Sequence, residues 1–125
     1  MKLGVFMSDF RGGSDVLDRL SAEKLGIILV GNGIYHATTK ENGKSSPLLD
    51  KSANFYVLSE DLESRGFSSA DVDSRVKPVT YSDVVDLIFN DYEKTIWISK
   101  GGNYGQIDYR LFFITGRLAI PRLWS

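Results

Sequence analysis

Residues able to bind an anion follow the first apolar segment of the chain. The stretch Ser8-Asp-Phe-Arg-Gly-Gly-Ser14 places two glycines and an arginine just before a predicted helix. Backbone N–H groups at the start of a helix bind phosphate or carboxylate groups, and an arginine adds positive charge. The stretch lacks the lysine of a Walker loop and the spacing of a dinucleotide-binding motif. An anion-binding loop of Arg11, Gly12, Gly13 and Ser14 is therefore one hypothesis, and a plain strand-to-helix turn is the favoured alternative.

The single histidine, His36, is the side chain best suited to proton transfer near neutral pH. Such a role normally needs a second histidine or a fixed carboxylate, and the sequence indicates neither. A histidine at the surface or in an interface is therefore the favoured interpretation.

Asp61 and Arg65 are four residues apart, a spacing typical of an exposed ion pair on a helix.

A phosphoacceptor site of the receiver type is another hypothesis. That fold places acids after the first and third strands, a hydroxyl after the fourth and a lysine after the fifth. Asp9, Asp61, Thr80 and Lys100 fall near these positions. The first acid is single, however, and Asp61 does not directly follow its strand. Chance placement is therefore the favoured explanation.

The chain contains no cysteine, which excludes more chemistry than any motif supports. Disulfides, cysteine-ligated zinc or iron–sulfur sites, and any step in which this chain itself carries sulfur are excluded. One histidine also argues against a histidine-rich metal site. We expect no catalytic residue, no metal and no cofactor.

Length and composition are typical of one globular domain. The 125 residues are 42% apolar and 25% charged. No apolar run approaches the ~18 residues of a membrane helix, and the first residues do not resemble a signal peptide. The expected location is the cytoplasm, away from membranes.

Five short apolar segments predict a parallel sheet that is covered on both faces. Most are continuous apolar runs, as is typical of strands buried between helices. Helical patterns lie between them, and right-handed crossovers then give an α/β fold. We expect a three-layer sandwich with a mostly parallel, flavodoxin-like five-stranded sheet and helices on both faces. The predicted strands are Leu3–Met7, Ile27–Val30, Phe55–Leu58, Val76–Val79 and Thr95–Ile98.

Two of the helices predicted between these strands carry recognisable end signals. The first begins at Ser14 as N-cap and stops at Gly26. The other covers 81–88, where apolar residues repeat with helical spacing, and Ser82 or Asp83 is its expected cap.

The helix predicted after the third strand has the most specific end signal. Ser59 is its expected N-cap, and Gly66 stands where a left-handed C′ residue belongs. This register sets Leu62 against Phe67, the contact that accompanies a Schellman motif.

The connection between the second and third strands is the least regular. Asn32-Gly33 is expected to turn the chain, 34–38 to start a helix and 41–47 to form a polar loop. Pro78 cannot donate a ladder hydrogen bond, so the fourth strand should be short or interrupted.

The last segment, 100–125, differs from the rest of the chain. It carries four basic residues against one acidic residue, and it is rich in aromatic and aliphatic side chains after a glycine-rich hinge at 100–105. Such a segment should pack on this domain or on a neighbouring chain. We expect a docking arm, with RNA contact and an extension foreign to the domain as alternatives, beside a domain of residues 1–99.

Three segments keep the order and spacing of one known family across about residues 1–99. In the first, 28–37, an apolar strand ends in Asn-Gly, a branched apolar residue and, after two more residues, a small alanine. In the second, 55–67, an acidic helix and Arg-Gly-Phe follow an apolar strand, and the third, 79–88, is a helix led by tyrosine. Together they resemble the DsrH/TusB branch of the DsrE/DsrF/DsrH superfamily.

The resemblance implies a small flavodoxin-like subunit of a cytoplasmic sulfur relay. Proteins similar to TusB assemble with DsrE/TusD-like and DsrF/TusC-like paralogues, which pass persulfide sulfur toward 2-thiouridine at the tRNA wobble position. The transferring cysteine lies on the DsrE/TusD-type partner, so a chain without cysteine would be a non-catalytic subunit without direct nucleic-acid contact. The superfamily also includes stand-alone homo-oligomers, which makes self-association the alternative.

The same resemblance points to the loop after the second strand as the partner-facing part. Tyr35 and His36 are the expected contacts, and Asn32 and Gly33 form the turn that presents them. We expect these residues to shape the pocket in which the partner's persulfide is held. The segment 100–125 lies outside the resemblance.

Overall fold

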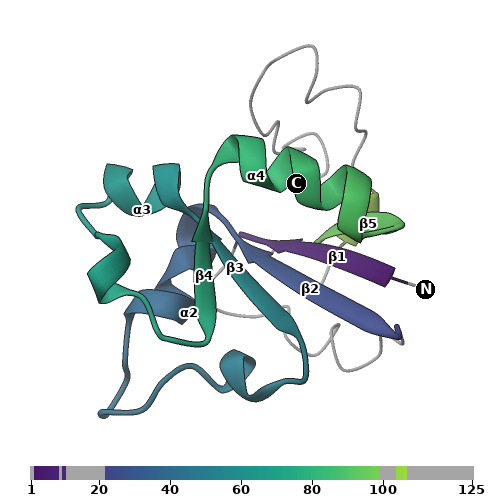
Figure 1. The fold of residues 1–125 in the computed structure, drawn as a ribbon. Helices are drawn as coiled ribbons and strands as arrows, with labels where there is room; N and C mark the ends of the chain where they lie inside the picture. Colours follow the sequence, from purple (N-terminus) through teal and green to yellow (C-terminus); the bar gives the residue numbers. More distant parts are fainter. Residues whose placement is uncertain (1, 9, 11–21, 99–103, 107–125) are drawn as a thin grey trace.

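A six-stranded sheet forms the centre of the molecule (Figure 1). The computed structural model describes residues 2–8, 10, 22–98 and 104–106. The strand order is β4-β3-β2-β1-β5-β6, in which the first five strands are parallel and β6 is antiparallel to β5. The predicted α/β fold with a mostly parallel sheet is confirmed. The strands are β1 Lys2–Met7, β2 Lys24–Leu29, β3 Asn54–Leu58, β4 Val76–Val79, β5 Lys94–Ile98 and β6 Tyr104–Gln106.

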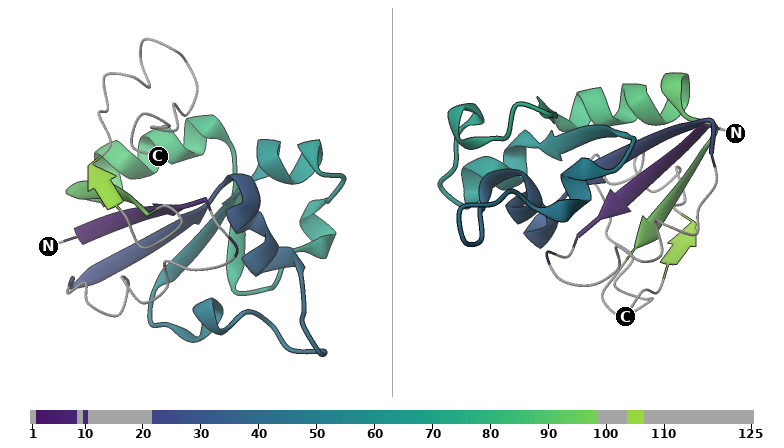
Figure 2. Two further views of the ribbon diagram at one scale, coloured as in Figure 1. Left: turned by 180° about the vertical axis from the view of Figure 1, so that it is seen from behind. Right: turned by 90° about the horizontal axis from the view of Figure 1, so that it is seen from below.

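The strand order also explains which helices cover which face. The chain steps outward from β1 through β2 and β3 to β4, and then returns across the sheet to β5. Because crossovers between parallel strands are right-handed, the return connection must lie on the opposite face from the first three. Figures 1 and 2 show α4 on one face of the sheet and α2 on the other. The helices are η1 Gly31–Ile34, α2 Tyr35–Thr38, η2 Pro47–Asp50, α3 Ser59–Ser64, η3 Ser69–Asp71, α4 Tyr81–Asp86 and the π-helix η4 Leu87–Asp91.

Two apolar layers hold these helices on the sheet. Successive residues of a strand point to opposite faces, so Ile27 and Ile28 of β2 enter different layers. The layer toward α2 continues into Leu48 of η2, and the layer toward α4 continues into Val84. Both faces of the sheet are therefore covered by packed apolar side chains, which accounts for the unbroken apolar runs in the sequence.

The predicted Schellman motif at the end of α3 is confirmed. Gly66 has a φ of +80°, Phe67 N–H donates to the Leu62 carbonyl at 3.0 Å, and Gly66 N–H donates to the Glu63 carbonyl at 3.1 Å. The predicted N-cap was wrong, because Leu58 occupies the N-cap position, without a side-chain hydrogen bond, and Ser59 is already the first residue of the helix. Strand β3 runs directly into α3, which leaves no separate capping residue between them.

The cap of α4 is Thr80, not Ser82 or Asp83 as predicted. The Thr80 hydroxyl accepts from Asp83 N–H at 3.2 Å, and an Asp83 carboxylate oxygen accepts from Thr80 N–H at 3.0 Å. This is a capping box, in which Asp83 serves as the reciprocal partner at N3. The helix begins at Tyr81, where the apolar stripe begins, and its cap directly precedes it.

Gly26 lies within β2 and does not end a helix, contrary to the prediction. A Cβ at Gly26 would overlap the ring of Tyr92, which packs over this point of the strand. The Tyr92 side chain is buried there, and this burial raises the pKa of its hydroxyl. Lys24 and Leu25 likewise belong to β2 and not to the predicted helix. The start of that helix, with its cap Ser14, lies outside the described residues.

Strand β4 covers the predicted residues, and its position in the sheet explains why it tolerates Pro78. It pairs only with β3, so it is an edge strand, the place where a missing N–H costs least. At the other edge, β6 includes Tyr104 and Gly105, which were predicted to belong to a hinge.

None of the helices in the described part of the chain is long and apolar enough to cross a membrane.

Candidate functional site

The turn after β2 is held closely against β1. Gly33 is buried, and a Cβ at this position would overlap the carbonyl group of Met7. Gly31 has a φ of +52°, and its N–H donates to a carboxylate oxygen of Asp61 at 2.7 Å. Glycine is thus needed at the predicted Asn32-Gly33 turn because the two backbones meet there.

Asp61 and Arg65 hold this turn and do not pair with each other, contrary to the prediction. Asp61 binds the Gly31 N–H, and Arg65 Nη2 donates to the side-chain oxygen of Asn32 at 3.4 Å. Asn32 itself is exposed. Asp61 of α3 and Arg65 at its C-terminal cap therefore fix the loop that follows β2.

Tyr35 and His36 begin the short helix α2 and lie in different surroundings. Tyr35 is half-buried, and its ring meets the rings of Phe10 and Phe67 edge-on, each at a centroid distance of 6.1 Å. His36 is only 7% exposed, and its ring lies 5.1 Å from that of Phe10. The favoured interpretation was a histidine at the surface or in an interface, and the surface position was wrong because His36 is buried within the chain.

A serine for which the sequence predicted no role makes the burial of His36 possible. His36 Nδ1 and the Ser46 hydroxyl are 2.6 Å apart in a buried hydrogen bond. Ser46 also caps η2, because its hydroxyl oxygen accepts from Leu48 N–H at 3.3 Å. A buried polar group needs such a partner. The Ser-Pro pair at the start of η2 was the signal that could have located this cap.

A tight turn precedes Ser46 and was not predicted. Glu41 and Lys44 form two backbone hydrogen bonds, of 3.0 and 2.9 Å, around Asn42 and Gly43. Both central residues have positive φ values, +52° and +76°, as a type I′ turn requires. The Asn-Gly dipeptide is the typical sequence signal of this turn, and it lies within the stretch that was predicted only to be a polar loop.

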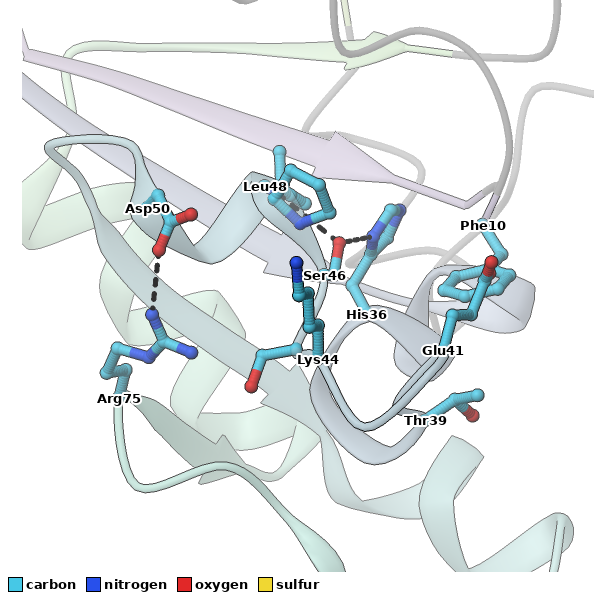
Figure 3. A pocket seen from close by; sticks show the side chains of 11 residues that line it. Phe10, His36, Thr39, Glu41, Lys44, Ser46, Leu48, Asp50 and Arg75 are labelled. Atoms are coloured by element: carbon cyan, nitrogen blue, oxygen red, sulfur yellow. Dashed lines mark hydrogen bonds and ion pairs between the residues drawn. The ribbon is translucent and has the colours of Figure 1, made fainter.

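These elements enclose a cavity of about 730 Å³ beside His36 (Figure 3). Its walls come from His36 of α2, from the segment 39–50, from Arg75 just before β4 and from Phe10. It combines apolar side chains with hydroxyl and charged groups. The lining residues are Phe10, His36, Thr39, Glu41, Lys44, Ser45, Ser46, Pro47, Leu48, Asp50 and Arg75. A smaller hollow of about 330 Å³ adjoins it and shares His36, Thr39 and Ser45.

Arg75 joins this segment to the residues before β4. Its Nε and Nη2 donate to the two carboxylate oxygens of Asp73, each at 3.0 Å, and its Nη1 reaches Asp50 at 3.1 Å. The hydrogen bonds from Arg75 lower the pKa of Asp73 to about 2. Ser45 adds a hydrogen bond to Asp73 at 3.4 Å. The Arg75 charge is thus balanced within the protein.

The other predicted site residues do not come together in one site. Arg11, Gly12, Gly13 and Ser14 lie outside the described residues, as do Asp9 and Lys100 of the receiver hypothesis. Of the latter constellation, Asp61 binds the Gly31 N–H and Thr80 caps α4. The part of the chain that the structure describes contains no cluster of three metal-binding side chains.

Comparison with known proteins identifies the family. No curated protein matches the chain. The solution structure of Tm0979 from Thermotoga maritima is 26% identical, covers 70% of this chain and 91% of that one, and has a TM-score of 0.48. MTH1491 from Methanobacterium thermoautotrophicum, a protein of unknown function, is 18% identical, covers 78% and 99%, and has a TM-score of 0.55, which shows a shared fold. The profile of the family described as DsrH like protein matches residues 8–94, and the chain belongs to this family.

Proposed function

We propose that the protein is a non-catalytic subunit of a cytoplasmic sulfur relay. In this proposal it assembles with cysteine-bearing DsrE- and DsrF-type paralogues and supports their transfer of persulfide sulfur, ultimately toward 2-thiouridine in tRNA. The observation that carries the proposal is membership of the DsrH-like family in a chain with no cysteine. A sulfur-handling role must then be exercised through a partner's thiolate, because the thiolate is the group that accepts sulfur.

The loop after β2 is the surface that we assign to the partner. Asn32 is exposed and Tyr35 is half-buried, so both can contact another chain. Gly33 and His36 are buried, and we assign them the supporting role of fixing the loop. The hydrogen bonds of Gly31 to Asp61 and of Asn32 to Arg65 hold the loop in one conformation, which lowers the entropy lost on binding.

Co-expression tests the assembly. This chain would be produced together with the DsrE- and DsrF-type paralogues encoded in the same genome, and the purified material measured by native mass spectrometry. We expect a hetero-oligomer that contains all of the chains. Homo-oligomers alone, at micromolar concentration, would overturn the proposal and favour a self-associating protein without a sulfur role.

A matched pair of variants tests the surface. Asn32→Arg places a long charged side chain on the loop after β2, whereas Asn90→Arg makes the same exchange at an exposed position of η4, beyond α4. Burying an unpaired charge in an interface is costly. We expect the first variant to reduce hetero-oligomer formation and the second to leave it intact. Equal effects would remove the loop from the interface.

A further inference from the structure

The cavity beside His36 has the size and lining of a small-molecule site. Its volume of about 730 Å³ falls within the range of roughly 300–1,000 Å³ that is typical of ligand pockets. Phe10, Pro47 and Leu48 provide apolar contact, and the Phe10 ring offers a flat surface. The sulfur-relay proposal places no ligand in this cavity and uses only His36 of its lining, as a support of the loop after β2.

The charged side chains of the lining are not equivalent. Arg75 is paired with Asp73 and Asp50 at 3.0–3.1 Å, and Glu41 has an interaction of its own. The Lys44 ammonium group has no hydrogen-bond or ion-pair partner among the residues that the structure describes. Lys44 is therefore the cation of the lining that has no direct ion pair among the described residues, although the charges of Glu41, Lys44, Asp50 and Arg75 together sum to zero.

The backbone at Lys44 is fixed by a tight turn. The type I′ turn closes with two backbone hydrogen bonds between Glu41 and Lys44. Figure 3 shows the Lys44 side chain extended over the cavity that Ser46 and Leu48 also line. Thr39 is half-buried and also lines the cavity, but Figure 3 shows it apart from Lys44. A ligand beside Lys44 would meet a cation next to an apolar surface.

We propose that this cavity binds a small organic monoanion with a flat apolar body. The body packs against Phe10 and Leu48, where an aromatic ring gains from stacking geometry in addition to burial. The anionic group pairs with Lys44 Nζ. A second negative charge would be repelled, because the carboxylates of Glu41 and Asp50 line the same cavity. An aromatic monocarboxylate meets these requirements.

Naphthalene-2-carboxylate is the probe for the test, with the 125-residue chain labelled with nitrogen-15 and titrated by NMR. We expect saturable shifts of amide signals between residues 36 and 48. The neutral analogue naphthalene-2-carboxamide should bind about fivefold or more weakly, since a hydrogen bond to a charged group stabilises more than a neutral one.

Two lysine variants test whether Lys44 supplies the positive charge that binds the carboxylate. Lys44→Gln should weaken binding of the carboxylate about fivefold or more and leave binding of the carboxamide unchanged. Lys77→Gln removes the same charge from an exposed position of β4 that lines neither cavity, and it should change neither affinity. Lys44 is exposed, so its replacement should not affect folding.

Phe10→Leu tests the flat surface and should weaken both ligands alike. The proposal is overturned by an absence of saturable shifts at millimolar probe, by equal affinities of carboxylate and carboxamide, or by an unchanged affinity in Lys44→Gln. Should Phe10→Leu fail to fold, the Lys44 comparison still decides the outcome.

Discussion

At the scale of single residues, Gly33 is where β1 and the loop after β2 touch. A Cβ there would overlap the backbone of Met7, which cannot move without disturbing the central strand. We expect Gly33→Ala to lower the free energy of unfolding by about 3 kcal/mol or more. Urea unfolding followed by circular dichroism measures this loss.

Gly43→Ala is the control for this substitution. A Cβ added at Gly43 would meet no atom within 4 Å, but the residue has a φ of +76°. Its replacement should therefore cost about 1 kcal/mol from backbone conformation alone. A smaller loss for Gly33→Ala than for Gly43→Ala would show that the close approach to Met7 is not tight.

Asp73 makes stability depend on pH in a defined direction. Its pKa in the folded protein is about 2, below the usual value because of the hydrogen bonds from Arg75, whereas in the unfolded chain it is about 3.9. The carboxylate therefore stabilises the fold fully above about pH 4, and this contribution is lost as the pH falls toward 2. Since Arg75 is 41% exposed, we expect only about 1–2 kcal/mol.

Asp73→Asn should accordingly destabilise the protein at pH 7 and approach the unsubstituted protein as the pH falls below 4. Urea unfolding at a series of pH values measures the difference. Asp86→Asn, at an exposed position of α4, should show no such convergence. A difference that stays constant down to pH 3 would contradict the assigned role of Asp73.

At the scale of elements, the start of α4 separates two interpretations of the same sequence. The sequence analysis favoured Ser82 or Asp83 as the cap, whereas the structure places the cap at Thr80. Thr80→Ala should therefore cost about 1 kcal/mol of unfolding free energy, and Ser82→Ala should stay within about 0.5 kcal/mol. The reverse order in chemical denaturation would support a cap at Ser82.

Local signals predicted elements better than contacts between them. The Schellman end at Gly66 depends on residues close in sequence, and it was predicted correctly. Gly26 was misplaced because its neighbour is Tyr92, far along the chain. The burial of His36 within the chain was not predicted, because its hydrogen-bond partner Ser46 lies ten residues away across an irregular segment. Sequence patterns do not indicate which residues far apart along the chain will be in contact.

At the scale of the whole molecule, the apolar runs were sufficient to predict a parallel sheet covered on both faces. The apolar runs did not predict the strand order, because that order depends on β5 pairing with β1. They also did not indicate β6, which has only three residues and includes a glycine. The cavity beside His36 was missed because it is formed where 39–50 meets Arg75, between segments that are separate in sequence.

The most direct test of the sulfur-relay role measures transfer in the presence and absence of this chain. A DsrE-type paralogue would receive sulfur from a donor protein loaded with cysteine persulfide, and the mass gain on its acceptor cysteine would be followed over time. We predict faster or more complete persulfide formation when this chain is present, with no mass gain on this chain itself. Equal rates and yields with and without the chain would contradict the account.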